Sequence, residues 1–406
     1  MLNKMVKNNW EIYMSVFLVQ LGFSVVTPVL SEIRVSFNLE SVAQTSLIIS
    51  SFAFARLLCD LPSGYLIQRF NPSALLTMSS IFVVTGSGLS FMANDYNLLL
   101  VGRFLAGGGS ALNIISAVFI LTRSAKPDKR GATLATYQAI LLLGIAMGPA
   151  LGGLAAVLAG WRGSFLVSLL AGCLALSIGL IRLYRQSNNY ETTAAAEVLD
   201  KTKIRSTPLP VHNYLSRIIV VNILTFLLLF ALEGFNSTII PLYGAQVLNL
   251  QPAYLGALLA WVAVIRLFAS FYGGVLSDKY GRGAVLIPTL LISGIGAGAL
   301  MLVQDRLTFV IIIVLFAVGR MGNNLNLSLL ADVTPPDRLG SIIGINRFLA
   351  DLGLVLGPWL LGILLDMFNF ITVGIIVALA SWLMALLVWL FFGINGKQNM
   401  VNMAKT

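Results

Sequence analysis

A chain of 406 residues with 58% hydrophobic and only 10% charged side chains is too apolar for a soluble fold, because globular proteins average about 45–50% apolar and about 25% charged residues. The mean hydropathy of +0.90 indicates instead a protein that lies mostly within a lipid bilayer. The net charge of +10 would fit a nucleic-acid partner, but the distribution of the basic residues argues against one.

Apolar runs separated by polar breaks predict membrane-spanning helices along the whole chain. A hydrocarbon core of ~30 Å needs about 20 apolar residues per helix, so this length holds about a dozen spans with short loops. The first run follows Lys4 and Lys7, but it is too long for a signal peptide and no small-residue cleavage site follows it, so we expect an uncleaved first helix. The predicted spans are 12–33, 43–66, 73–93, 98–121, 132–157, 163–183, 216–240, 252–276, 284–303, 307–330, 341–366 and 371–393.

Basic residues outside these spans are distributed unevenly. If the N-terminus is cytoplasmic, the predicted cytoplasmic segments carry most of the lysines and arginines, whereas the opposite loops carry only Arg34, Arg162 and Arg306. This bias follows the positive-inside rule and accounts for the net charge without a nucleic-acid partner. We therefore expect a multi-pass protein of the cell inner membrane with both termini in the cytoplasm.

The chain divides into two related halves joined by a polar segment. Residues 187–213 are rich in Asn, Thr and charges and cannot bury enough apolar surface to fold alone. The stretch 56–64 aligns with 266–274 at a separation of 210 residues, and Pro127-Asp128 matches Pro336-Asp337, and Gly148-Pro149 matches Gly357-Pro358, at 209. The sequence therefore predicts an all-α membrane protein with twelve transmembrane helices in two pseudo-symmetric six-helix bundles, 1–186 and 214–406, joined by a cytoplasmic linker.

Other kinds of site find no support in the sequence. His212 is the only histidine and lies in the polar segment, so neither a histidine metal cluster nor a Ser-His-Asp triad can form. Cys59 and Cys173 lie in apolar stretches, where each reads as a small buried hydrophobic residue. The sequence has no phosphate-binding loop. We expect no enzymatic activity, metal or cofactor, and any transport to be independent of ATP hydrolysis by this chain.

Charged side chains within the predicted spans are the most informative residues. An Arg or Asp at a helix centre costs about 2.5–3.5 kcal/mol on insertion scales, so such residues usually face a cavity and mark function. Away from the ends of the predicted spans, these residues are Arg56, Asp60, Arg103, Glu233, Arg266, Arg320, Arg347 and Asp351.

Glu233 is the strongest candidate for a proton-binding group. It lies alone in an apolar stretch of the predicted seventh helix, which suits a carboxyl group that binds and releases a proton. The alternative is a permanent ion pair with Arg266 on the predicted eighth helix.

A polar stripe on the predicted tenth helix is a candidate for substrate contact. It begins at Arg320 and continues through Asn323, Asn324 and Asn326. These side chains could orient a substrate in a cavity, or they could form a hydrogen-bond network that packs helices together.

A loop sequence now points to a family. The stretch Gly274-Val-Leu-Ser-Asp278-Lys-Tyr-Gly281-Arg282 resembles the signature of the major facilitator superfamily between helices eight and nine. The resemblance implies that Asp278 lies near the positive end of a neighbouring helix and locks one conformation. The corresponding loop of the first half has Gln68 where the family has an acid. We therefore expect the second copy to contribute more than the first to stabilising that conformation.

Two further stretches resemble the twelve-helix drug:proton antiporter branch of that superfamily. On the predicted fifth helix, Gly144, Gly148, Pro149 and Gly152 are similar to the antiporter signature, and such small residues let a neighbouring backbone approach closely. Packing alone is the alternative, because Gly353 and Gly357-Pro358 partly repeat the pattern. On the predicted fourth helix, the stretch from Arg103 to Ala111 resembles the signature that the family is thought to use in proton transfer.

The family's helix order also suggests partners for four of the buried charges. Helix geometry places Asp60 and Arg347 at similar depth from the cytoplasmic ends of their helices, and Arg56 and Asp351 at similar depth. Since the family brings helices two and eleven together, we predict the pairs Asp60 with Arg347 and Arg56 with Asp351. Pairing within each helix, at a spacing of four residues, is the alternative.

The sequence therefore predicts a secondary active transporter that exports a small amphipathic drug or metabolite by alternating access in exchange for protons. We expect Glu233, Asp60, Asp351 and Arg103 to take part in proton coupling, and the other buried arginines and Asn323 to line the substrate cavity. A monomer is the habit of the family. The alternatives are a lipid flippase or uptake symporter of the same fold and, more remotely, a membrane sensor that transports nothing.

Overall fold

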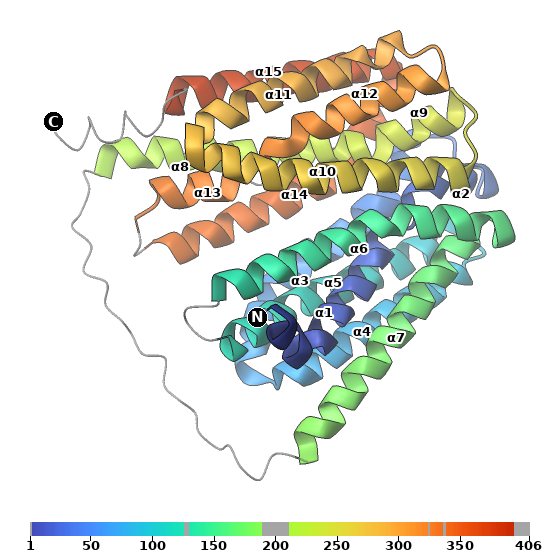
Figure 1. Ribbon diagram of the computed structural model, residues 1–406. Coiled ribbons are helices and arrows are strands. Elements are labelled where there is room, and N and C mark those ends of the chain that lie inside the picture. Colours follow the sequence, from blue (N-terminus) through green and yellow to red (C-terminus); the bar gives the residue numbers. More distant parts are fainter. Residues whose placement is uncertain (1, 126–129, 189–210, 324, 336–337, 394–406) are drawn as a thin grey trace. The chain divides into compact units, whose positions relative to one another are not determined.

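The computed structural model describes residues 2–125, 130–188, 211–323, 325–335 and 338–393, and all regular secondary structure within them is helical (Figure 1). Within these residues, eleven helical stretches are long and apolar enough to cross a membrane. A further apolar helix, α11 (Arg282–Gly298), has 17 residues and continues into the 3₁₀-helix η5 (Ala299–Leu302), so that together they cover all but the last residue of the predicted span 284–303. The prediction of an all-α membrane protein is confirmed.

The described residues form two compact units. The first contains α1 to α7, apart from the start of α3 up to Ser46, together with the start of α10 up to Ala260. The second contains that start of α3 and the elements from α8 to α15, apart from the start of α10. Most of the predicted linker 187–213 and the Pro127-Asp128 and Pro336-Asp337 matches lie outside the described residues, so the predicted domain boundaries stay a prediction.

The first unit is built from long helices that short turns connect. Its elements are α1 (Leu2–Ser24), η1 (Thr27–Val29), α2 (Leu30–Ser36), α3 (Val42–Arg69), α4 (Pro72–Phe91), α5 (Tyr96–Ser124), α6 (Arg130–Ala159) and α7 (Trp161–Asn188). Side chains at the turns supply the hydrogen-bond acceptors that helix starts need: Asn71 caps α4 by accepting from Ser73 N, and Asp95 caps α5 by accepting from Leu98 N.

The second unit repeats this architecture, with more interruptions. Its elements are α8 (Val211–Leu227), η3 (Leu228–Glu233), η4 (Phe235–Ile239), α9 (Ile240–Gln246), α10 (Pro252–Tyr280), α11, η5, α12 (Arg306–Gly319), η6 (Arg320–Gly322), α13 (Leu325–Val333), α14 (Leu339–Met367) and α15 (Phe370–Phe392). The carboxylate of Asp305 and the side-chain amide oxygen of Asn369 cap α12 and α15.

Close helix crossings recur at corresponding places in the two units. A Cβ atom added to Gly86 on α4 would lie 2.5 Å from the backbone of α5 at Ala106. Gly296 on α11 stands 210 positions later, and a Cβ there would lie 2.8 Å from the backbone of α12 at Phe316. The same contact at the same separation supports the internal repeat, because only a glycine lets two helices approach so closely.

Three membrane-spanning stretches are interrupted near their middle. The first stops being α-helical at Ser24 and passes through η1 before α2. The stretch from α8 to α9 contains two π-helical segments, η3 and η4. The stretch from α12 to α13 contains the 3₁₀-helix η6, which begins at Arg320. Interrupted membrane helices and π-helical turns concentrate at binding sites, so these places direct attention to their side chains.

Candidate functional site

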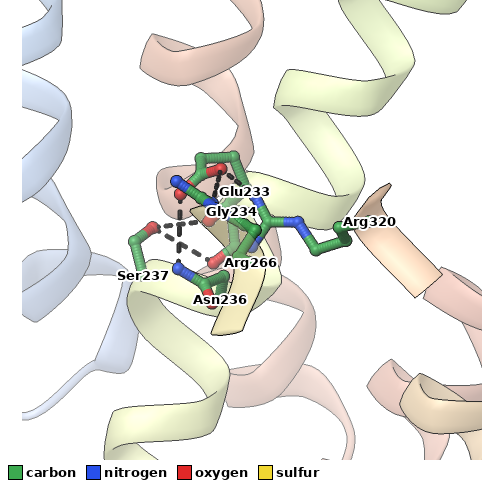
Figure 2. Close-up of polar contacts among 6 residues, drawn as sticks. All are labelled: Glu233, Gly234, Asn236, Ser237, Arg266 and Arg320. Atoms are coloured by element: carbon green, nitrogen blue, oxygen red, sulfur yellow. Dashed lines mark hydrogen bonds and ion pairs between the residues drawn. The ribbon is translucent and has the colours of Figure 1, made fainter. Parts of the chain in front are cut away.

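Glu233 lies at an interruption in the second unit, as the last residue of the π-helical segment η3, two positions before η4 begins at Phe235. Figure 2 shows that Arg266 from α10 and Arg320 from η6 approach its carboxylate. Arg266 donates from Nη1 to Glu233 Oε2 at 3.1 Å, and Arg320 donates from Nη2 to the same oxygen. The other oxygen, Oε1, accepts from Asn236 Nδ2 at 3.3 Å. Three chain segments are therefore joined through one carboxylate.

The three charged side chains differ in their access to the surroundings. Glu233 and Arg266 retain 20% and 21% of their side-chain surface exposed, whereas Arg320 retains only 2%. Phe316, one turn earlier on α12, lies with its ring centroid 5.5 Å from the Arg320 guanidinium. The Arg320 Nε atom is buried without a hydrogen-bond partner among the described residues. A buried guanidinium with an unused N–H can donate a hydrogen bond to a further anionic ligand.

The ion pair between Glu233 and Arg266 is the arrangement that the sequence offered as an alternative to a lone carboxyl. Arg320, predicted as part of a substrate stripe, is a second partner. The structure thus brings together three predicted site residues from three helical stretches, all in the second unit. The predicted role of Glu233 in proton binding stays a prediction. A proton that binds this carboxylate would have to compete with Arg266 and Arg320.

The stripe that follows Arg320 does not act as one surface. Asn323 lies directly after η6 and is half-buried. Asn326 is buried and donates to Thr225 Oγ1 on α8, and Asn346 on α14 donates to the same hydroxyl at 2.7 Å. Asn326 therefore belongs to a network that packs α8, α13 and α14 together, which the sequence left open. Asn324 lies outside the described residues.

The remaining charges of the predicted network lie on α3 and α14. Arg347 donates from Nε to Asp351 Oδ2 at 3.4 Å, with Asp351 almost fully buried and Arg347 45% exposed. This contact is the within-helix alternative for that pair of residues. Arg56 and Asp60 lie four residues apart on α3, where Arg56 is buried and Asp60 half-buried. The pairs predicted between α3 and α14 stay predictions.

Arg103, on α5 in the first unit, has a different environment. Its guanidinium donates to three backbone carbonyl oxygens: Ile48 O on α3, and Gly22 O and Phe23 O at the end of α1, each at 3.2 Å. The ring of Phe52 lies 4.6 Å from the guanidinium. Because the last carbonyls of a helix lack partners within it, Arg103 caps α1 where that helix is interrupted. Its predicted part in proton transfer stays a prediction.

The predicted glycine row of the fifth span packs on the same end of α1. A Cβ on Gly144 would lie 2.6 Å from Phe17 O, and one on Gly148 would lie 2.7 Å from Leu21 O, while Gly152 faces Val25. Pro149 cannot donate to Ile145 O within its own helix, and the hydroxyl of Ser24 on α1 donates to that oxygen at 2.7 Å. The signature therefore holds α6 against the interrupted end of α1.

The second unit repeats this packing in part. A Cβ on Gly353 of α14 would lie 2.7 Å from Phe226 O on α8, and Gly357 packs on the carbonyl of Phe230 in η3. Close packing is thus shared by both copies. It does not by itself separate a role in the direction of transport from a purely structural one.

The loop signature in the second unit forms a small ionic cluster. Arg282 donates from Nη1 to Asp278 Oδ1 and Ser277 Oγ, both at 2.8 Å, and from Nε to Asp332 Oδ2 on α13 at 3.1 Å. Gly281 between α10 and α11 has φ +101°, which favours glycine. A Cβ on Gly274 would contact nothing within 4 Å. Sequence reasoning missed Asp332, which lies two residues after the predicted span 307–330.

Sequence reasoning also missed an acid in the first membrane-spanning stretch. Glu32 on α2 has a buried carboxylate oxygen without a hydrogen-bond partner among the described residues. It lies inside the predicted span 12–33, one residue before its end, and is not among the charges singled out within the spans. The interruption of the first stretch brings this acid into a partly buried environment.

Comparison with known proteins identifies the family. A model of the Major Facilitator Superfamily matches residues 12–265 and 221–402, which together span nearly the whole chain. The chain belongs to the major facilitator superfamily. It is therefore a secondary transporter of small molecules, as the loop signature around Asp278 predicted.

Relatives within the superfamily include proteins named for drug efflux. The multi-drug resistance efflux pump PmrA homolog of Lactococcus lactis is 27% identical over 298 residues, covering 73% of this chain and 72% of that protein. The quinolone resistance protein NorA of Staphylococcus aureus is 23% identical over 364 residues, covering 89% and 90%. These relatives agree with the branch that the fifth-span signature indicated.

Solved structures of the superfamily share the fold at low sequence identity. A D-xylose-proton symporter matches with a TM-score of 0.76 at 14% identity, over 94% of this chain and 97% of that one. A bacterial homolog of the human lysosomal transporter Spinster matches with a TM-score of 0.73 at 16% identity, over 95% of both chains. The predicted major facilitator fold is confirmed.

Proposed function

We propose that this transporter exports a small amphipathic molecule in exchange for protons, by alternating access. The observation that carries the proposal is the Glu233 carboxylate, held by two arginines at interruptions of two membrane-spanning stretches. Transporters of this architecture bind substrates and coupling ions near the bilayer midplane at such interruptions. A carboxylate that changes partners there can link proton binding to conformation.

The direction of transport is supported by the relatives and by the glycine row. The Lactococcus and Staphylococcus proteins are named as an efflux pump and a drug resistance protein. The row of Gly144, Gly148 and Gly152 resembles the antiporter signature and packs on the interrupted end of α1. Together these features favour export over uptake.

The distribution of the basic residues supports a proposal for the location of the protein and its orientation in the membrane. We propose a location in the cell inner membrane with both termini cytoplasmic, because the segments then facing the cytoplasm carry most of the lysines and arginines. Such an orientation lets the proton gradient drive exchange, since a charge crossing the membrane gains about 2.3 kcal/mol per 100 mV. We further propose that a monomer performs the cycle.

Transport into inside-out vesicles tests this proposal. Vesicles with an acidic lumen and a panel of fluorescent dyes should accumulate at least one dye, and that dye should raise the lumenal pH as it enters. Collapsing the proton gradient should release the dye. Accumulation that persists without a gradient, or uptake by right-side-out vesicles with an acidic exterior, would contradict proton-driven export.

A further inference from the structure

The Glu233 cluster contains more positive than negative charge. Two guanidiniums, from Arg266 and Arg320, converge on the single oxygen Oε2 of one carboxylate. Asn236, the further side-chain partner of that carboxylate, is neutral. With Glu233 ionised, the cluster carries one surplus positive charge.

Within the described residues, Arg266 and Arg320 form ion pairs with no acid other than Glu233. Away from the helix ends, the other charges of its described spans are Arg347 and Asp351, which pair with each other at 3.4 Å. An uncompensated charge is costly within a membrane, and proteins reduce this cost by pairing it. A ligand that brings one negative charge would make the cluster neutral.

Donor geometry in the cluster also points to an anion. The buried Nε of Arg320 has no partner among the described residues, although Nη2 of the same group is engaged by Glu233. A guanidinium presents its donors as a planar fork that matches the two oxygens of a carboxylate, sulfonate or phosphate. Glu233 and Arg266 keep about a fifth of their surface exposed, which gives a ligand a side from which to approach.

Apolar and aromatic groups adjoin the charged cluster. Phe316 lies over the Arg320 guanidinium, and its ring centroid is 5.2 Å from that of Phe235, two residues after Glu233. Phe226 and Phe230, on the turns before Glu233, stack with centroids 5.6 Å apart. Phe235 and Phe316 are buried, whereas Phe226 and Phe230 are half-buried. The half-buried pair leaves apolar surface on the same chain segment as Glu233, which suits a ligand with a hydrophobic body and one polar end.

We propose that Arg320 and Arg266 bind the anionic group of the substrate, a carboxylate, sulfonate or phosphate on an apolar body, while Glu233 stays paired at the same cluster. The inference rests on the proposed function, because it assigns the substrate class of that same site. One bound anion neutralises the cluster with Glu233 still ionised, whereas a cation would meet a net positive charge. The anion comes from a soluble amphiphile or from a lipid headgroup, which share this chemistry.

Equilibrium binding of two related dyes tests the proposal without any proton gradient. Fluorescein and rhodamine 123 share the xanthene ring system but carry opposite charges. The purified full chain in phosphatidylcholine nanodiscs is titrated against each dye, with fluorescence anisotropy as the readout. Fluorescein should bind at least about tenfold more tightly than rhodamine 123, since a charge-assisted hydrogen bond typically changes affinity by that much or more. Equal binding, or tighter binding of rhodamine 123, overturns the proposal.

Variants locate the binding. Arg320→Gln should weaken fluorescein binding about tenfold or more, whereas Glu233→Gln, which increases the surplus charge, should tighten it. Arg306→Gln, an exposed arginine at the start of α12, is the matched control and should leave binding unchanged. If Arg320→Gln fails to fold, as judged by gel filtration, Arg266→Gln takes its place with the same expectation. Unchanged fluorescein binding in the folded variant overturns the proposal.

A competition experiment with an anionic lipid identifies the source of the anion. Nanodiscs that contain phosphatidylglycerol should compete with fluorescein if a lipid headgroup occupies the cluster, and should leave fluorescein binding unchanged if a soluble amphiphile is the ligand. Failure of this inference remains distinct from failure of the proposed function. Proton-driven export of cationic dyes without fluorescein binding overturns only the anion assignment, and fluorescein binding without proton-driven transport of any dye overturns only the transport proposal.

Discussion

The two units share a helical architecture, but the second unit has more interrupted stretches and different buried charges. In the second unit, an interrupted stretch places Glu233 between Arg266 and Arg320. The positions 210 residues earlier hold Phe23, Arg56 and Ser110, so only the arginine of α10 has a counterpart in the first unit. A duplicated scaffold has kept its packing and changed its charges.

The first unit fills the corresponding region with neutral hydrogen bonds. Ser110 donates to Gln20 Oε1 at 3.1 Å, and Asn113 donates to Ser15 Oγ at 3.0 Å, with all four side chains buried. One of its buried arginines, Arg103, donates to backbone carbonyls at the end of α1. The difference indicates that a buried guanidinium held by backbone oxygens stabilises a helix break, whereas one held by a carboxylate is available for exchange of partners.

The largest expected effect separates these two roles of arginine. Arg103→Gln should lower the free energy of unfolding by about 3 kcal/mol or more, because three buried carbonyl oxygens lose their donor at ~1–3 kcal/mol each. Arg320→Gln should cost less, since Glu233 keeps Arg266 and Asn236. Thermal unfolding of the purified variants measures both. A larger stability loss for Arg320→Gln would remove the distinction between the arginines.

The next effect concerns the charges on α3 and α14. Asp351 is almost fully buried and Arg347 is its ion-pair partner, so Arg347→Asp should cripple transport because it places a second acid beside that buried carboxylate. Adding Asp60→Arg should restore activity if the predicted pair between the helices is correct. Adding Asp351→Arg instead should restore it if the within-helix contact is the one that matters. Dye transport in vesicles, corrected for the amount of protein, reports which reversal rescues.

A smaller effect is expected at the loop signature. Arg282 is held by Asp278 and Asp332, whose side chains are 73% and 36% exposed, so each contact contributes only about 0–1 kcal/mol to stability. A shift of about 1 kcal/mol in a conformational equilibrium still changes populations about fivefold. Arg282→Gln and Asp278→Asn should therefore slow transport several-fold at unchanged thermal stability. Gln68→Ala, in the copy without the acid, should transport like the wild type, and equal slowing in all three variants would contradict the asymmetric lock.

Much of the fold could be predicted from the sequence because bilayer physics leaves few alternatives. An apolar run of about 20 residues must be helical in a membrane, and close glycine spacing at equal offsets exposes the repeat. The interruptions at Ser24, in the π-helical stretch around Glu233 and at Arg320 could not be predicted. They depend on which neighbouring helices supply hydrogen-bond partners to the interrupted backbone and its surroundings. One example is the Ser24 hydroxyl, which donates to Ile145 O, the carbonyl that Pro149 leaves without a donor.

The candidate site could be predicted as a set of residues but not as an arrangement. The cost of burying charge singled out Glu233, Arg266 and Arg320. Their convergence on one oxygen depends on helix rotation, which the sequence does not encode in any short pattern. For the same reason Asn326 looked like a neighbour of Arg320, although it contacts Thr225 instead.

The smallest effect tests the packing at the interrupted end of α1. Ser24→Ala should lower stability by about 1 kcal/mol, because the carbonyl of Ile145 loses the hydroxyl that compensates for Pro149. Ser177→Ala is the matched control, since that exposed hydroxyl donates only within its own helix, to Cys173 O. The control should unfold at the wild-type temperature. Equal unfolding temperatures for the two variants would show that the Ser24 contact contributes nothing.

The central claim is that the charged cluster of the second unit, and not its neutral counterpart in the first, couples transport to protons. The direct measurement compares Glu233→Gln with Gln20→Ala in vesicles, by following dye accumulation and lumenal pH together. Glu233→Gln should lose proton-driven accumulation while still exchanging dye for dye, because the amide keeps the shape of the carboxyl group but cannot titrate. Gln20→Ala should retain proton-driven accumulation. Undiminished proton-driven accumulation by Glu233→Gln would contradict the account.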